Sequence, residues 1–224
     1  MAYTNSSLVS TTKLSPNHSG QRNHPIDRIT PHCVVGQLSA ESVLAIFEPV
    51  ARQASCNYCI GTDGKIGLCV EEKNRSWCSS SPANDHRAVT IECASDRLAP
   101  YAFTDAVYYR LIELCADICR RNGKKKLIWI PDKTRALAYE PAEDEMQLTV
   151  HRWFANKDCP GEWLMSHMDD LARRVTDLLE KKETASDPGK TYCLILGEDK
   201  KEAQKALALL RSVGYKVKLG SLRN

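Results

Sequence analysis

The sequence predicts an α/β protein in which a central mixed β-sheet is flanked by helices, followed by a small C-terminal βαβ-like unit. Segments with strand character alternate with segments of helical periodicity, which favours helices packed on a sheet. The turn Thr-Asp-Gly at 62–64 separates two strand-like runs, 55–60 and 65–70, and indicates a β-hairpin, so the sheet is expected to be mixed. Apolar residues at helical spacing follow Thr104 and recur over 162–181, which predicts two long amphipathic helices.

The chain before the hairpin contains three expected segments. Residues 1–25 are polar and indicate an extended arm. The β-branched residues of 27–35 predict the first strand of the sheet. Ser39 can then cap a helix that runs to about Gln53 and turns its apolar residues inward.

The chain after the hairpin contains two further strands and the two long helices. Residues 87–94 predict a strand, and either Thr104 or Asp105 caps the first long helix. Residues 126–130 predict another strand, which is expected to be buried. The second long helix places its apolar residues on one stripe, namely Leu164, Met168, Leu171, Val175 and Leu178.

The C-terminal part has a different composition. Residues 182–190 are charged and small and contain Pro-Gly, which predicts a linker between a domain at 1–181 and a unit at 191–224. That unit has a strand–helix–strand pattern of about thirty residues, too few to bury both faces of its elements. We therefore expect it to dock on the first domain or to pair with another copy of the chain.

Composition limits the classes of function. The net charge of +3 and the pI of about 8.3 are too weak a bias to indicate nucleic-acid binding. Lys124, Lys125 and Lys126 form a small cluster that is expected to be the solvated start of a strand. The polar N-terminal residues show no signal peptide, and no apolar run could span a bilayer, so we expect synthesis in the cytoplasm and no membrane association.

The ten cysteines are not expected to form a disulfide framework, because the sequence indicates a reducing compartment. Cys56 and Cys59 form a Cys-x-x-Cys motif, and Cys69 and Cys78 follow it, a set of thiols that could form a structural zinc ribbon. Two arguments disfavour it. The residues between the pairs have the pattern of a hairpin, and the second pair is not closely spaced.

Two distant stretches together carry the ligands of a hydrolytic metal site. The stretch ITPHCVVG contains His32 on a strand, and TVHRWFANKDCPGEW contains His151, Lys157 and Cys159. Two imidazoles and one thiolate leave a tetrahedral position open, which is typical of catalytic rather than structural zinc. Since any single histidine is usually an ordinary polar residue, the hypothesis depends on the complete set.

With these residues in place, the sequence resembles the zinc-dependent N-acetylmuramoyl-L-alanine amidases, which include T7-type phage lysozyme, AmpD-type enzymes and peptidoglycan recognition proteins. The resemblance covers about residues 26–180. It depends on His32-Cys33 at the end of the first strand, on TDGKI at 62–66, on RSWCSSSPANDHRAVTIEC at 75–93, and on His151 eight residues before Cys159 within KDCPG. The greatest similarity is to endolysin-type amidases of phages and mobile elements of Gram-positive bacteria.

The resemblance implies a fold, a substrate and a role for each residue. It implies a zinc amidase domain at 1–181 with zinc at the edge of the sheet, held by His32, His151 and Cys159, and peptidoglycan as the substrate. Glu92 corresponds to the glutamate that exchanges protons during hydrolysis, and Lys157 to the lysine that stabilises the oxyanion. These roles agree with general acid–base and electrostatic catalysis. Cytoplasmic synthesis is then followed by release and action on the cell wall.

The sequence departs from the family pattern at one catalytic position. Many relatives carry a tyrosine in the strand before the hairpin turn, where this chain has Cys56. Tyr58, two residues further on, shares a face with Cys56 on a regular strand and could substitute, or Glu92 could act alone. Trp77 and Asn84 lie in the region that corresponds to the substrate groove, although packing and turn roles are equally compatible with the sequence.

Two alternatives stay open for the function of the protein, and two for the role of its C-terminal unit. The protein could be a wall-binding module without catalysis, although the presence of Cys159 disfavours this, or a cytosolic amidase that recycles soluble muropeptides. Residues 191–224 resemble half of a SPOR-type peptidoglycan-binding repeat, while a plain element of homo-oligomerisation fits equally well.

Overall fold

The computed structural model describes residues 3–184. The expectations for the C-terminal unit at 191–224, and for the linker beyond Thr184, lie outside the described residues. Within 3–184, no helix combines the length and the apolar character needed to cross a membrane. The nine cysteines of this part of the chain are free thiols.

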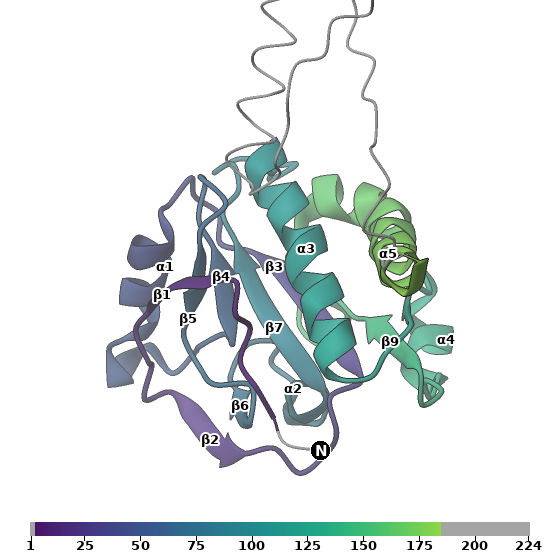
Figure 1. Ribbon diagram of the computed structural model, residues 1–224. Helices are drawn as coiled ribbons and strands as arrows, with labels where there is room; N and C mark the ends of the chain where they lie inside the picture. Colours follow the sequence, from purple (N-terminus) through teal and green to yellow (C-terminus); the bar gives the residue numbers. More distant parts are fainter. Residues whose placement is uncertain (1–2, 185–224) are drawn as a thin grey trace, which may run out of the picture. The chain divides into compact units, whose positions relative to one another are not determined.

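A seven-stranded sheet forms the centre of the protein, and its prediction as a mixed sheet flanked by helices is confirmed (Figure 1). Only the hairpin pair β4–β5 is antiparallel, and the other neighbours in the sheet run parallel. In spatial order the strands are β1 (Val9–Thr12), β5 (Ile66–Leu68), β4 (Tyr58–Ile60), β7 (Ala88–Cys93), β3 (Arg28–Cys33), β9 (Glu145–Leu148) and β8 (Lys126–Ile128).

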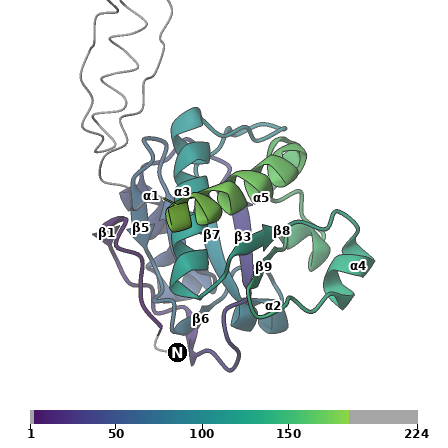
Figure 2. The ribbon, with the colours of Figure 1, turned by 45° about the vertical axis from the view of Figure 1, so that its right-hand side comes forward.

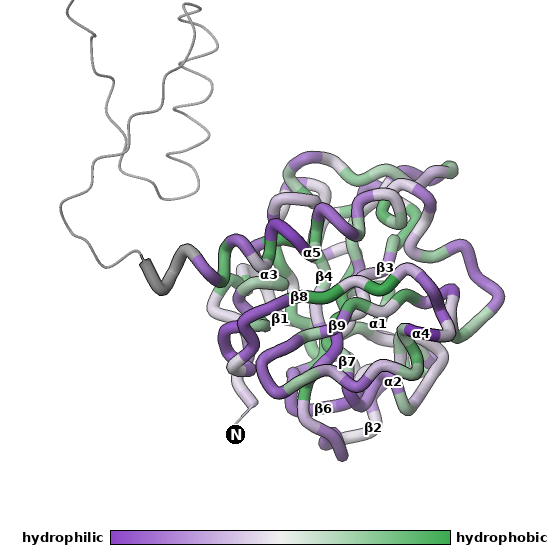
Figure 3. The backbone as a smooth tube through the Cα atoms, turned by 90° about the vertical axis from the view of Figure 1, so that its right-hand side faces the viewer, coloured by the Kyte–Doolittle hydropathy of each residue, from purple (hydrophilic) through white to green (hydrophobic). Residues whose placement is uncertain are grey.

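The two long helices cover one face of this sheet. Helices α3 (Asp105–Arg121) and α5 (Gly161–Thr184) pack on each other and on the strands (Figure 2). Thr104 caps α3, because its hydroxyl accepts a hydrogen bond of 3.3 Å from the amide of Val107. Hydrophobic residues concentrate along the central strands, whereas the outer loops are hydrophilic (Figure 3). This distribution produces the larger of two apolar clusters.

The opposite face is covered by α1 (Ala40–Phe47), whose apolar residues form the second cluster with Cys56, Cys59 and Cys69. Ser39 caps α1 as expected, with its hydroxyl accepting from the amide of Ser42 at 3.2 Å. The helix does not reach Gln53, because Pro49 ends the regular pattern and a 3₁₀ turn at Val50–Arg52 follows. Part of this face stays open beside α1, over the carboxyl ends of β3 and β7.

The N-terminal segment pairs with the rest of the domain through two short strands. Strand β1 pairs in parallel with β5 at the edge of the sheet, and β2 (His18–Gln21) pairs with β6 (Asn74–Ser76) in a separate two-stranded ribbon. Asn17, which is 1% exposed, donates to the carbonyls of Phe47 and Pro49 at 3.1 and 2.9 Å. Polar residues of the arm are therefore buried against backbone groups, a pattern that the composition does not indicate.

At the β8 edge of the sheet, one predicted strand needs correction and one strand was not predicted. Residues 126–130 were expected to form a buried strand, but β8 ends at Ile128 and is the edge strand of the sheet, with Lys126 exposed. Strand β9 lies between β8 and β3 and was not expected. Two short helices, α2 (Pro82–Arg87) and α4 (Lys133–Ala138), were not expected either.

Candidate metal centre

Three side chains predicted to bind a metal meet on the open face of the sheet. His32 comes from β3, His151 from the 3₁₀ turn His151–Trp153, and Cys159 from the loop before α5. Their ligand atoms all lie within 4.8 Å of one another. The Cys159 Sγ is 3.3 Å from the His32 Nδ1, and the two imidazole rings have centroids 5.0 Å apart.

The register of parallel strands explains why the two histidines meet. Strand β9 pairs with β3 so that Gln147 lies opposite Arg28 and Leu148 opposite Ile29. The ladder continues beyond β9, because the amide of Thr149 donates to the carbonyl of Ile29 at 3.0 Å. Three residues beyond Leu148 and Ile29, His151 and His32 therefore become neighbours.

The chemistry of this group fits a zinc ion. The Nε2 of His32 is buried and has no hydrogen-bond partner among the described residues, which is costly unless something else engages the ring. Burial, and then the neighbouring His151, hold the pKa of His32 well below its usual range, so its ring is neutral and able to ligate. Two imidazole nitrogens and one thiolate suit a borderline-soft ion such as zinc.

The pKa values of Cys159 and His151 are also shifted. A hydrogen bond with the Cys33 thiol, together with burial, raises the pKa of the Cys159 thiol well above its usual range. Burial, and then the charge of Lys157, lowers the pKa of His151. A metal that binds here would have to displace the proton of Cys159, as thiolate-binding metals do.

Glu92 lies beside the three ligands. It pairs with His32 across β7 and β3, so both side chains project from the same face of the sheet. Burial raises the pKa of Glu92 to about 7. One carboxylate oxygen accepts a weak hydrogen bond from the Cys78 Sγ at 3.8 Å, and the other is buried without a partner in the described chain. This carboxyl group is therefore able to exchange a proton near neutral pH.

A groove of about 530 Å³ opens over this site. Glu92, His151, Lys157 and Trp77 all line it. The groove is also lined by residues for which the sequence predicted no role in the site: Cys33, Phe47, Arg52, Arg75, Cys78, Ser80 and Asp85. Several of the predicted site residues thus share one solvent-accessible cavity.

Trp77 forms part of the groove wall, and the N-terminal arm holds it there. Its indole Nε1 donates to the hydroxyl of Ser19 on β2 at 2.6 Å. The guanidinium of Arg75 donates to the same hydroxyl. Strand β2 therefore supports the wall of the groove, a contribution that the expected arm did not suggest.

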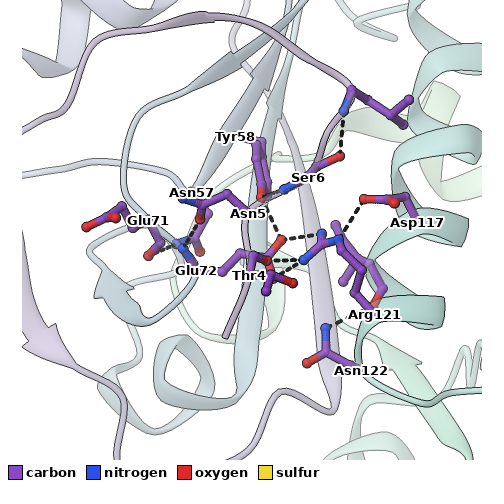
Figure 4. Close-up of polar contacts among 12 residues, drawn as sticks. Thr4, Asn5, Ser6, Asn57, Tyr58, Glu71, Glu72, Asp117, Arg121 and Asn122 are labelled. Carbon is purple, nitrogen blue, oxygen red and sulfur yellow. Dashed lines mark hydrogen bonds and ion pairs between the residues drawn. The ribbon is translucent and has the colours of Figure 1, made fainter. Parts of the chain in front are cut away.

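Tyr58 is not brought to this groove. Its hydroxyl donates to the carboxylate of Glu72 at 2.6 Å and accepts from the amide of Ser6 at 2.8 Å (Figure 4). Glu72, only 1% exposed, also forms a two-pronged ion pair with Arg121, at 2.5 and 2.9 Å. Burial and the Glu72 carboxylate raise the pKa of Tyr58 above its usual range. Tyr58 therefore belongs to a buried cluster with Glu72 and Arg121 and does not contact His32, His151 or Cys159.

A break in the strand pattern explains why Tyr58 points away. Cys56 belongs to the cluster under α1, whereas Tyr58 belongs to the cluster under α3 and α5. Between them, the carbonyl of Asn57 accepts from the amides of both Cys69 and Val70, at 2.9 and 3.2 Å. This irregularity in the hairpin disturbs the alternation on which the expected shared face depended.

Asn84 is also absent from the groove. Its side chain, 1% exposed, hydrogen-bonds Thr30, Thr149 and Ser79 beneath the ligands instead. Within the described residues, Cys56, Cys59 and Cys69 do not form a group of ligand atoms that all lie within 4.8 Å of one another, so the Cys-x-x-Cys motif builds no metal site with Cys69. Cys78, by contrast, lies with His32 and Glu92 in a second group of donor atoms within 4.8 Å.

Comparisons with known proteins agree with this geometry. A family model described as N-acetylmuramoyl-L-alanine amidase matches residues 22–162, which include His32, His151 and Cys159. Among solved structures, the catalytic domain of XlyA is 12% identical with a TM-score of 0.53, covering 75% of this chain and 99% of its own.

A second solved structure is the Staphylococcus aureus hydrolase AmiA in complex with its ligand. It is 14% identical with a TM-score of 0.52, covering 80% of this chain and 86% of its own. At such low identities, both structures establish the fold alone. No curated protein matches the chain.

Proposed function

This chain belongs to the N-acetylmuramoyl-L-alanine amidase family, and we propose that it is a zinc-dependent enzyme that cleaves the amide bond between the lactyl group of N-acetylmuramic acid and L-alanine. As a member of this family it is a peptidoglycan amidase. The observation that supports zinc dependence is the convergence of His32, His151 and Cys159, with Glu92 in register beside them.

His32, His151 and Cys159 would hold the ion. When bound there, zinc would supply Lewis acidity, which polarises a carbonyl group and makes water a strong nucleophile near pH 7. His32 lies on β3, and His151 follows two residues after Thr149, whose amide is hydrogen-bonded to that strand, so the backbone already holds these two donors close together.

Glu92 would transfer the protons of the reaction. Its carboxylate accepts a proton from the attacking water and later donates one to the leaving amine of L-alanine. Burial raises its pKa to about 7, which suits a group that must both take and give a proton near neutral pH.

Lys157 would stabilise the charge on the scissile carbonyl oxygen. It is exposed at the groove and, among the described residues, forms no ion pair that would neutralise it. An ammonium group in this position is attracted to the oxyanion of the tetrahedral intermediate more strongly than to the neutral ground state. Trp77 supplies an apolar wall on which the glycan or the peptide can pack.

The setting that we propose is lysis of the cell wall by a phage or prophage endolysin, after release from the cytoplasm. A cytosolic role in muropeptide recycling predicts activity on soluble fragments and none on intact sacculi. A wall-binding module without catalysis predicts binding to sacculi and no products.

The decisive experiment is product analysis on purified peptidoglycan, with the chelated protein and the zinc-restored protein compared side by side. The zinc-restored protein should release new N-terminal alanine and no new reducing sugar ends, and the chelated protein should release neither. New reducing ends would identify a glycosidase and contradict the amidase proposal, whereas full activity after chelation would contradict zinc dependence alone.

For the C-terminal region we propose a role in binding the wall or in oligomerisation, based on its sequence. A chain ending at Ala185 should retain hydrolysis of soluble muropeptides, because the ligands, Glu92 and Lys157 all precede that point. Loss of wall lysis with an unchanged number of chains per particle would support wall binding, and fewer chains per particle would support oligomerisation. A truncated protein equal to the full chain in both measurements would contradict the proposal.

A further inference from the structure

Two threonines lie directly beneath the two histidine ligands. Thr30 precedes His32 by two residues on β3, and Thr149 precedes His151 by two residues on the segment that continues β9. The ladder between the segments places the threonines side by side, with their hydroxyl oxygens 2.7 Å apart. Both are fully buried.

Asn84 joins this pair from α2. Its Nδ2 donates to the Thr30 hydroxyl at 3.0 Å, and its Oδ1 accepts from the Thr149 hydroxyl at 3.1 Å. Asn84 is itself buried, with 1% of its surface exposed. One side chain therefore bridges the two segments that carry the histidines.

Counting donors shows that the three groups form a closed ring of hydrogen bonds. A threonine hydroxyl has one hydrogen to donate, and Thr149 uses it on the carbonyl oxygen of Asn84. The contact between the threonines must then be donated by Thr30, whose oxygen in turn accepts from the amide of Asn84. Each member donates once and accepts once within the ring, so the contacts polarise one another in a dry environment.

Asn84 also ties this ring to the groove. Its Nδ2 reaches the hydroxyl of Ser79 at 3.2 Å, and that hydroxyl donates to the buried carboxylate of Asp85 at 2.6 Å. The same carboxylate accepts from the amide of Cys78 at 3.1 Å. The loop that lines the groove and the two ligand segments are thus held by one buried network.

We propose that Asn84 is a positioning residue for the metal centre, holding the His32 and His151 segments at the separation that the ion requires. This inference rests on the proposed function, since it assumes that His32 and His151 bind the ion. Changes to groups that orient ligands commonly cost tenfold to a hundredfold in metal affinity. We expect Asn84→Ala to weaken the affinity for zinc by at least about tenfold.

The test measures metal binding rather than turnover. Metal-free full-length protein is titrated with Zn²⁺ against a competing chelator, and with Co²⁺, whose visible spectrum reports the geometry of histidine and thiolate ligands. Asn17→Ala is the matched control, because Asn17 is buried to the same 1%, also donates two hydrogen bonds, and contacts no ligand segment. Both variants should lose comparable thermal stability, and only Asn84→Ala should lose affinity and change the Co²⁺ spectrum.

A second pair of variants decides the question if Asn84→Ala does not fold. Thr149→Val removes the hydroxyl while keeping the shape, and should weaken zinc binding in the same direction. Thr149→Ser keeps the hydroxyl and should restore most of the affinity. Wild-type affinity and spectrum in Asn84→Ala, or in Thr149→Val where Asn84→Ala does not fold, would overturn the inference. A wild-type protein that takes up neither ion would instead overturn the proposed metal centre itself.

Discussion

His32 and Glu92 lie opposite each other in register on the parallel strands β3 and β7. A proposed metal ligand and the proposed proton-transfer group are therefore both fixed by the backbone hydrogen bonds of a sheet. Strand geometry sets their spacing and makes them project from the same face. Such a rigid base is what a preorganised catalytic site requires.

We expect Glu92→Gln to keep the metal and to lose most of its turnover. The amide has the shape of the carboxyl group but accepts no proton from water, and losing a general base typically lowers the rate about 10²- to 10⁴-fold. Hydrolysis of a soluble muropeptide should be measured together with zinc content. Near wild-type turnover in a zinc-loaded variant would assign proton transfer to another group.

The same substitution should change how the stability of the metal-free protein depends on pH. The pKa of Glu92 rises from 4.5 to about 7 on folding because burial penalises the charge. The stability from this group is thus fully present below pH 4.5 and is lost as the pH rises through 7, by an amount on the order of 3 kcal/mol.

Denaturant unfolding of chelated wild type and Glu92→Gln at pH 5 and pH 8 checks this expectation. Comparing the two proteins cancels the titration of groups that both contain. The wild type should lose more stability than the variant between these two pH values, and equal losses would show that Glu92 is not desolvated in solution.

Replacing Cys159 with serine should remove most of the affinity for zinc, because a neutral hydroxyl is a much poorer ligand than a thiolate. Cys115→Ala is a suitable control, since it removes a fully buried thiol from α3, away from the ligands. Zinc stoichiometry after dialysis is the measurement. Unchanged zinc content in Cys159→Ser would place the metal elsewhere in the chain.

Tyr58→Phe should lower stability and leave hydrolysis nearly unchanged. The substitution deprives Glu72 of a donor and the Ser6 amide of its acceptor, and an unsatisfied buried group costs roughly 1–3 kcal/mol. Thermal unfolding and kcat on a soluble muropeptide separate the two effects. A large fall in kcat at wild-type stability would show that Tyr58 takes part in catalysis.

The contrast between these residues shows how far the sequence can predict the site. His32, His151 and Cys159 could be proposed as one set because two imidazoles and one thiolate fit a single metal ion and their sequence context resembles the family's motifs. The two histidines meet because of the register of β9 against β3, and the sequence pattern did not predict β9. Tyr58 and Asn84 could not be placed, because a hairpin irregularity turned one away and a buried polar ring engaged the other. Neither feature leaves a periodic signal.

The N-terminal segment illustrates a second limit. Strands β1 and β2 consist largely of polar residues, and their pairing depends on backbone and hydroxyl contacts with distant parts of the chain, such as the bond between Ser10 and the carbonyl of Ile66. Hydrophobic periodicity therefore indicates an arm, while the structure contains an edge strand and a support for the groove. The functional consequence of that support is open to a direct test.

Ser19→Ala should raise the KM for peptidoglycan fragments while leaving kcat and thermal stability close to wild type. Ser19 is the hydrogen-bond partner of the Trp77 indole, at 2.6 Å, and of the Arg75 guanidinium. Its side chain contacts neither the ligands nor Glu92, so its loss should loosen the groove wall without disturbing the chemistry. A residue that stabilises the bound substrate and the transition state equally changes KM alone.

Ser10→Ala is the control, because it removes a comparable hydroxyl from the N-terminal segment. The Ser10 hydroxyl donates to the carbonyl of Ile66 at 3.0 Å and contacts no groove residue. Steady-state kinetics on one soluble muropeptide should therefore give a raised KM for Ser19→Ala and wild-type values for Ser10→Ala. Equal KM values in the two variants would mean that β2 has no part in substrate binding, and a fall in kcat for Ser19→Ala would mean that Trp77 acts on the chemical step.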